Sequence, residues 1–199
     1  MKKQEHTYHL FLFLGSFSRG LIEVFSLVLL YKKGFTINNL YLFLLISYIF
    51  GNISSHLSLK LNHKIILIIS NILYGISFLY LSKISRSIIS LIIFALFLSF
   101  SNYSFHTIRH YYALNMLNNK KDTSIIVVMM YLGTTSSSLI GSLLLERISP
   151  FLTSIIVLII SSLSCIPIFK YKESLKPEPL NHIAKINKNK IIFSILEQF

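Results

Sequence analysis

Long hydrophobic runs, separated by short polar segments, dominate the pattern of residues along this chain. An apolar helix of about 20 residues crosses the hydrocarbon core of a bilayer. The runs are continuous, whereas a transmembrane β-strand requires about ten residues of alternating hydrophobicity. The pattern therefore predicts an all-α transmembrane protein with six spans. The expected spans are residues 8–30, 39–59, 65–82, 87–108, 124–145 and 150–169.

Composition supports the lipid bilayer as the environment of this chain. Hydrophobic residues make up 53% of the 199 positions and charged residues only 13%, whereas a soluble domain carries about a quarter charged residues. The net charge of +12 would point to nucleic acid in a soluble protein. Here the basic residues lie mostly between the hydrophobic runs and in the C-terminal tail, so topology explains them better. We therefore expect the bilayer, and no nucleic acid, as the partner.

The distribution of basic residues predicts the orientation of the spans. Lys and Arg are enriched in the cytoplasmic loops of membrane proteins. With the N-terminus inside, most basic residues outside the spans fall in cytoplasmic segments, and the outer loops hold few, such as Lys83 and Arg86. The N-terminal apolar stretch is too long for a signal peptide and is interpreted as a retained span. We therefore expect a multi-pass protein of the cell (inner) membrane with both termini in the cytoplasm.

Segment 170–199 differs in composition from the bundle that precedes it, residues 1–169. It begins as a polar, basic stretch that contains Pro177 and Pro179. Residues 191–199 then start a new apolar segment that is too short to cross a bilayer. The segment is therefore predicted to be a cytoplasmic linker followed by the truncated start of a second half.

Three short segments add a family resemblance to this layout. The first span ends in L29-L-Y-K-K-G-F-T36, which resembles the end of the first helix in major facilitator superfamily transporters. The loop at 58–64 stands where that family carries Gly-x-x-x-Asp-Arg-x-Gly-Arg-Lys, and residues 137–142 match the place of its Gly-Pro-x-x-Gly-Gly motif. The second motif keeps one glycine, Gly141, and lacks the proline. The first motif keeps only its basic positions and has no aspartate. The basic positions are Lys60, His63 and Lys64, and Asn62 stands in the place of the motif's glycine.

The chain is thus similar to the N-terminal six-helix half of a major facilitator superfamily transporter. The resemblance implies a six-helix bundle that moves a small solute by alternating access, with the substrate between two bundles. It implies no cofactor, and a second six-helix half or a second copy of the chain as partner. Two alternatives remain open: an inactive fragment of a split gene, and a membrane scaffold that transports nothing.

Two opposite charges, Arg19 and Glu23, lie near the middle of the first hydrophobic run. Each charge costs about 2.5–3.5 kcal/mol to insert at the centre of a helix, and such residues usually face a bundle interior or a water-filled cavity. Their spacing of four residues puts both side chains on one face of a continuous helix. The pair predicts a substrate or ion pathway, in which Arg19 meets an anionic group or Glu23 carries a coupling proton. A purely structural pair is the alternative.

The polar end of the fourth span supplies a second group of candidates. Because the fourth helix of the resembled family faces the cavity, Asn102 and His106 are expected to contact the substrate or ion. Arg109 and His110 fit an interfacial role better, in which they reach lipid headgroups. His106 and His110 have the spacing of a zinc-binding helix, but the glutamate of H-E-x-x-H and a third ligand are missing. No metal site is therefore expected.

Small and polar residues in other spans indicate helix packing. Gly133, Ser137 and Gly141 recur every four residues in the fifth span, a pattern that lets another helix approach closely. Close and adjustable packing also suits the seam of a rocking transporter. Polar residues in the second and third spans are interpreted as hydrogen-bonding contacts between helices. They are Asn52, Ser55, His56 and Asn71.

Enzyme chemistry has little support in the sequence. Gly75 and Ser77 resemble the Gly-x-Ser of intramembrane serine proteases, but after His110 no histidine follows until His182 in the tail. Carboxylate clusters and nucleotide-binding loops are absent from the sequence. We therefore expect a protein that is not an enzyme.

Overall fold

The computed structural model describes residues 2–115 and 120–170 of the chain, and these residues form helices and short connections without any strand. The helices are α1 (Lys2–Gly20), η1 (Glu23–Phe25), α2 (Ser26–Lys32), α3 (Ile37–Lys60), α4 (His63–Ser82), α5 (Ile88–Asn115), α6 (Lys120–Arg147) and α7 (Pro150–Lys170). Within the described ranges, six stretches are long and apolar enough to cross a membrane. The predictions of an all-α chain and of six candidate membrane spans are confirmed. The tail from residue 171, including the expected linker, lies outside the described residues.

The six stretches differ from the expected spans mainly at their ends. They run over Tyr8–Lys32, Ile37–Lys60, His63–Ser82, Ile88–Tyr111, Ser124–Arg147 and Pro150–Phe169. The second and third begin early because polar residues cap them: Thr36 accepts a hydrogen bond from the Asn39 amide, and Asn62 from the Ile65 amide. The polar end of the fourth span remains helical as far as Asn115.

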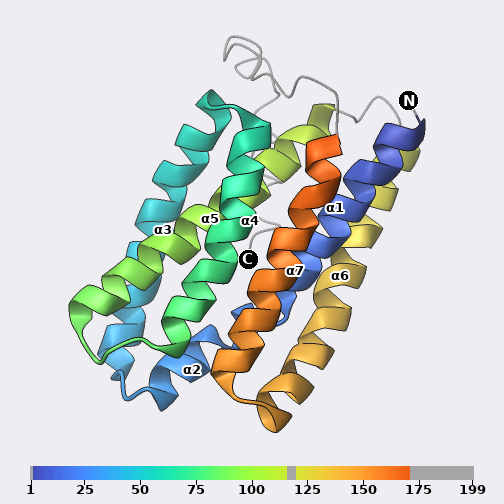
Figure 1. The fold of residues 1–199 in the computed structure, drawn as a ribbon. Coiled ribbons are helices and arrows are strands. Elements are labelled where there is room, and N and C mark those ends of the chain that lie inside the picture. The colour runs from blue at the N-terminus through green and yellow to red at the C-terminus, as the bar shows by residue number, and fades with distance from the viewer. Residues whose placement is uncertain (1, 116–119, 171–199) are drawn as a thin grey trace.

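The helices form a bundle in which each span packs against particular neighbours (Figure 1). Helix α1 packs against α6 and α7, and α2 contacts α3. Helix α3 packs against α5, and α4 packs against both α5 and α7. Figure 1 shows α3 and α6 at opposite sides of the bundle, with α4 and α7 in front of α5 and α1. The first and fourth spans therefore lie behind the third and sixth in this view.

The packing contains an internal symmetry that relates the two halves of the bundle. Exchanging the first span with the fourth, the second with the fifth and the third with the sixth leaves the set of main packed pairs unchanged. Spans three apart run in opposite directions in this up-and-down bundle, so the two three-helix units have inverted topology. Inverted three-helix repeats occur in secondary transporters.

The exposed faces of the bundle differ in chemistry. Isoleucines one or two turns apart cover the exposed face of α4, and the exposed face of α7 is mainly apolar as well. The residues concerned are Ile65, Ile69, Ile72 and Ile76 on α4, and Leu152, Ile159, Leu163 and Ile166 on α7. Faces of this composition suit contact with lipid, whereas partly exposed polar side chains occur where the first span meets α5.

Candidate functional site

The first span is broken near its middle, at the place where the two charged residues lie. Helix α1 ends at Gly20, and the chain turns at Leu21 and Ile22 before the short helix η1 begins at Glu23. Ile22 has φ −139° and ψ −15°, which is outside helical geometry. The expectation that Arg19 and Glu23 share one face of a continuous helix is therefore wrong. The turn points the two side chains to different partners.

Helix α6 covers this break at very short range. A Cβ atom added to Gly141 would overlap the carbonyl oxygen of Leu21, and one added to Gly20 would overlap the hydroxyl of Ser137. Ser138 Oγ donates a hydrogen bond to the Gly20 carbonyl oxygen at 3.4 Å. At Gly133 an added Cβ would lie 2.8 Å from the Phe13 carbonyl oxygen. The small residues of the fifth span thus pack along α1 and supply a polar contact to the backbone that the break exposes.

Arg19 is buried inside the bundle, with 2% of its surface exposed. Its Nη1 atom donates to the Gly15 carbonyl oxygen at 3.1 Å and to Asn71 Oδ1 at 2.6 Å. Its Nη2 atom donates to the Ser101 carbonyl oxygen at 3.4 Å. The Phe105 ring centroid lies 3.6 Å from the guanidinium carbon, a cation–π contact. The charge is therefore met by carbonyl and amide oxygens and by an aromatic face.

These contacts tie four spans together around one side chain. Asn71 on α4 passes the network on to α7, because its Nδ2 atom donates to Ser164 Oγ at 3.0 Å. The Tyr74 hydroxyl, also on α4, donates to the Arg19 carbonyl oxygen at 2.7 Å. Among the described residues no carboxylate lies within ion-pair distance of Arg19, and its Nε atom has no hydrogen-bond partner. In this conformation the guanidinium is enclosed, so its position fits a bracket between helices better than contact with a solute.

Glu23 lies on the other side of the break and is only half-buried. Asn102 of α5 donates a hydrogen bond from Nδ2 to Glu23 Oε1 at 2.5 Å. Asn102 is 9% exposed, and its Oδ1 atom is buried without a hydrogen-bond partner in the described part of the chain. His106 follows one helical turn along α5 and is half-buried. The structure therefore joins Glu23 to Asn102 by a direct hydrogen bond. Arg19 makes no hydrogen bond to Glu23 and acts on it, as on His106, only through electrostatics.

The end of the fourth span holds a second buried cation. Arg109 is 8% exposed, and its Nη2 atom lies 3.1 Å from His110 Nε2. Its Nε atom has no hydrogen-bond partner among the described residues. Within residues 2–115 and 120–170 there is no group of three His, Cys, Asp or Glu side chains that could hold a metal ion.

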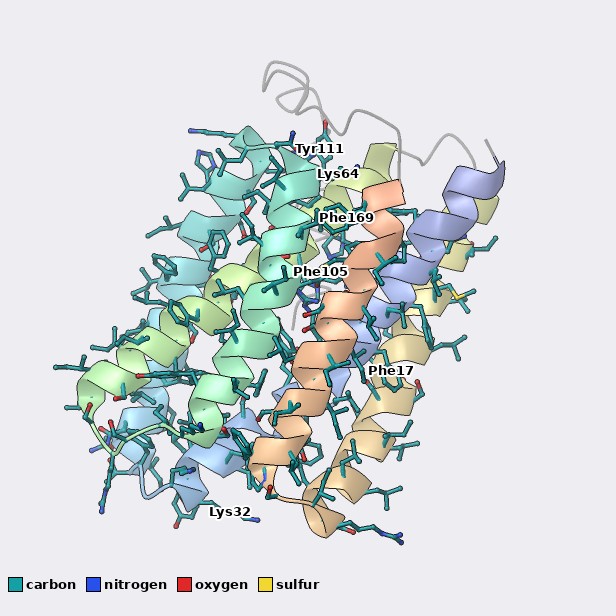
Figure 2. The ribbon with its side chains drawn as sticks, in the orientation of Figure 1. Phe17, Lys32, Lys64, Phe105, Tyr111 and Phe169 are labelled. Atoms are coloured by element: carbon teal, nitrogen blue, oxygen red, sulfur yellow. The ribbon has the colours of Figure 1, made fainter. Side chains whose placement is uncertain are left out.

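The loop at Lys60–Lys64 joins several helix ends at one end of the bundle. Asn62 caps α4 through the contact described above, and the buried His63 lies 3.4 Å from the Leu59 carbonyl oxygen. The His63 ring also packs edge-on against Tyr111 of α5, with 4.9 Å between the ring centroids. Lys64 Nζ donates to the Phe169 carbonyl oxygen of α7 at 3.1 Å, whereas Lys60 is exposed. Lys64, Tyr111 and Phe169 lie at the same end in Figure 2, opposite Lys32.

Second-span residues contact α5 through a stripe that the sequence analysis identified only in part. Ser58 Oγ donates to Ser104 Oγ at 2.7 Å, and Ser55 Oγ accepts from Thr107 at 2.9 Å. Gly51 leaves room for the ring of Tyr103, and this glycine was missed. In the sequence, this glycine is part of a pattern in which a small residue recurs at every third or fourth position. That stripe is Ser47, Gly51, Ser54 and Ser58.

Four other candidate residues have ordinary structural surroundings. Asn52 donates to the Tyr48 carbonyl oxygen of its own helix, and His56 is exposed, so neither bonds to another helix through these groups. Ser77 Oγ donates to the Tyr74 carbonyl oxygen within α4. Gly75 is in close contact with Leu158 of α7. The Gly75–Ser77 segment is therefore part of a helix interface.

Among the described residues, two polar sites thus lie beside the break in the first span, an enclosed one around Arg19 and a partly exposed one at Glu23 and Asn102. Their members come from spans that are far apart in the sequence, as the Arg19–Asn71 and Glu23–Asn102 contacts show. No protein family, curated protein or solved structure matches this chain.

Proposed function

We propose that this chain is one six-helix half of a facilitator-type secondary transporter, which moves a small solute across the membrane by alternating access. The observation that carries the proposal is the half-buried Glu23 at a break in the first span. Broken helices near the bilayer midplane, in bundles built from inverted repeats, form the substrate and ion sites of secondary transporters. The packed pairs of this bundle have that inverted three-helix symmetry.

The energetic cost of Glu23 supports an assignment of its face to the translocation pathway. An ionised carboxylate near the bilayer centre costs about 2.5–3.5 kcal/mol unless protein or water surrounds it. Asn102 donates the one hydrogen bond that the described residues supply to this carboxylate. The rest of its polar surface requires water or a second protein surface, and a cavity between two bundles provides both. The partner is a second copy of the chain or a separate six-helix half.

The proposal also assigns an orientation in the cell membrane. Helix α1 starts, and α7 ends, at the end of the bundle that carries the loop Lys60–Lys64 (Figure 1). The tail beyond residue 169 is rich in lysine, and an excess of basic residues marks the cytoplasmic side. We therefore assign this end and both termini to the cytoplasm.

A reconstituted uptake assay tests the proposal. The full chain is placed in vesicles, alone and with a co-expressed second six-span half, and uptake of labelled sugars, amino acids and nucleosides is measured under a proton gradient. We expect uptake of at least one solute, and its loss in Glu23→Gln. Glu146→Gln is the matched control, because Glu146 is exposed at the end of α6. Uptake that survives Glu23→Gln contradicts the assigned pathway.

A membrane scaffold without transport is the second candidate, and one observation favours it. The Arg19 network ties α1, α4, α5 and α7 together and leaves the guanidinium enclosed. A rigid bracket of this kind suits a static bundle, including an inactive fragment of a split gene. Absence of uptake for every solute and with either partner selects this candidate.

A further inference from the structure

Asn102 uses one end of its side-chain amide and leaves the other end unused. Nδ2 donates to Glu23 Oε1, while the buried Oδ1 has no hydrogen-bond partner in the described part of the chain. Buried polar atoms of native proteins are nearly always paired, so an unpaired acceptor requires an explanation. The unpaired atom belongs to the same planar amide that contacts the carboxylate. A second state of the carboxylate therefore provides an explanation.

The chemistry of the two side chains defines that second state. An ionised carboxylate only accepts hydrogen bonds, whereas a protonated carboxyl also donates one. An asparagine amide offers two N–H donors at one end and a carbonyl acceptor at the other, with nearly the same shape. A half-turn of the Asn102 amide would therefore replace the Nδ2 donor by the Oδ1 acceptor at the same place.

We propose that Glu23 and Asn102 form a proton-binding pair, in which the Asn102 amide turns over when Glu23 takes up a proton. The proton joins a carboxylate oxygen of Glu23, the Nδ2–H···Oε1 hydrogen bond breaks, and an O–H···Oδ1 hydrogen bond forms in its place. The inference rests on the proposed transport function and names the proton as its coupling ion.

A proton fits this site better than a metal cation. The amide presents an N–H donor to the carboxylate, and a donor repels a bound cation, which is held by several oxygen ligands. The described residues contain no cluster of His, Cys, Asp or Glu that could hold a metal ion. Glu23 and Asn102 alone supply too few oxygen ligands.

Among the other charged and titratable groups around the pair, Arg19 acts on Glu23 through electrostatics, but its hydrogen bonds and that of Tyr74 go to other partners. On α1, the Arg19 guanidinium bonds to Asn71 and backbone oxygens, and on α4 the Tyr74 hydroxyl bonds to the Arg19 carbonyl oxygen. His106 lies one turn along α5 from Asn102. Helix α6 presents small, non-titrating residues to the break, and the buried thiol on α7, Cys165, lies 3.8 Å from the Ile68 carbonyl oxygen. Glu23 is therefore the proton acceptor that the Asn102 amide contacts directly.

Infrared difference spectroscopy of the purified full chain in lipid tests the pair without any solute. The protein carries asparagine labelled with ¹³C at the side-chain carbonyl, and spectra are recorded as the pH is lowered. We expect a protonated-carboxyl band and a shift of the labelled amide band with the same midpoint. The component of the carboxyl band that titrates together with the amide band disappears in Glu23→Gln and remains in Glu146→Gln. The amide shift disappears in Asn102→Leu and remains in Asn52→Leu, because Asn52 is exposed and bonds within its own helix.

Three results would overturn the inference. One is the absence of any component of the carboxyl band that depends on Glu23, and another is a Glu23 component that titrates while the Asn102 amide band stays constant. The third is a midpoint that moves when sodium replaces choline, because a competing metal cation would then occupy the site. Both bands titrating together in a protein that transports no solute would refute the transport function and leave the proton-binding pair intact.

Discussion

Replacing Arg19 with leucine should make the first span easier to insert and the folded bundle less stable. The substitution removes the hydrogen bonds to the Gly15 carbonyl, to Asn71 and to the Ser101 carbonyl, and it removes the cation–π contact with Phe105. It also removes a charge whose insertion costs about 2.5–3.5 kcal/mol. This gain in insertion free energy is the same for the inserted, unfolded chain and for the folded bundle, because the span is in the membrane in both states. It therefore does not change the free energy of unfolding.

The free energy of unfolding changes because the contacts of Arg19 are lost. Polar contacts between membrane helices contribute about 0.6 kcal/mol each on average, so the two that join helices, to Asn71 and to the Ser101 carbonyl, amount to about 1 kcal/mol. A desolvated cation–π contact adds about 2 kcal/mol. The loss of Arg19 also leaves Asn71 Oδ1 buried without its 2.6 Å partner. We therefore expect Arg19→Leu to lower the free energy of unfolding by about 3 kcal/mol.

Unfolding in mixed micelles, titrated with a denaturing detergent and followed by circular dichroism, measures this loss. Arg147→Leu is the matched control, because Arg147 is an exposed arginine at the end of α6, and it should change stability by less than about 0.5 kcal/mol. A double-mutant cycle with Asn71→Leu should give a coupling of at least about 0.5 kcal/mol. An Arg19→Leu variant as stable as the wild type, with no coupling to Asn71, would refute the claim that Arg19 holds the helices together.

Three further substitutions probe other contacts, the first two by the same unfolding assay and the third by hydrogen exchange. Gly141→Ala forces α6 away from the Leu21 carbonyl and should cost about 1–3 kcal/mol, whereas Ser142→Ala on the same helix should cost little. Tyr74→Phe removes the hydrogen bond to the Arg19 carbonyl and should cost about 1 kcal/mol; an unchanged midpoint would rule out a contribution from that bond. Lys64→Ala should raise hydrogen exchange at the end of α7, where Lys64 bonds to the Phe169 carbonyl, and the exposed Lys60→Ala should not.

The helices and candidate spans could be predicted from the sequence because both follow from local properties. Continuous apolar runs of about 20 residues require helices in lipid, and capping residues account for the earlier starts of the second and third spans. Asn62, for example, extends the third span back to His63 by accepting a hydrogen bond from the Ile65 amide.

The sites could be predicted only in part, because their contacts are not local. The break after Gly20 lies in a run of residues that carry no proline, and its turn is matched by small residues of α6 more than a hundred positions away. The partner of Arg19 proved to be Asn71, not Glu23. The pairing of Glu23 with Asn102 likewise depends on how the first and fourth spans cross. The four-residue spacing of Arg19 and Glu23 therefore suggested an ion pair. The turn in the backbone prevents that pair.

The central claim is that Glu23 faces water or a second bundle, and not lipid. A spin label tests it most directly, attached at Glu23→Cys in a Cys165→Ser background, with Ile159→Cys on the exposed apolar face of α7 as the control. In lipid vesicles, a label at 23 should be relaxed more by a water-soluble nickel chelate than by dissolved oxygen, and a label at 159 should show the reverse. If both positions favour oxygen, the Glu23 side faces lipid and the account is contradicted.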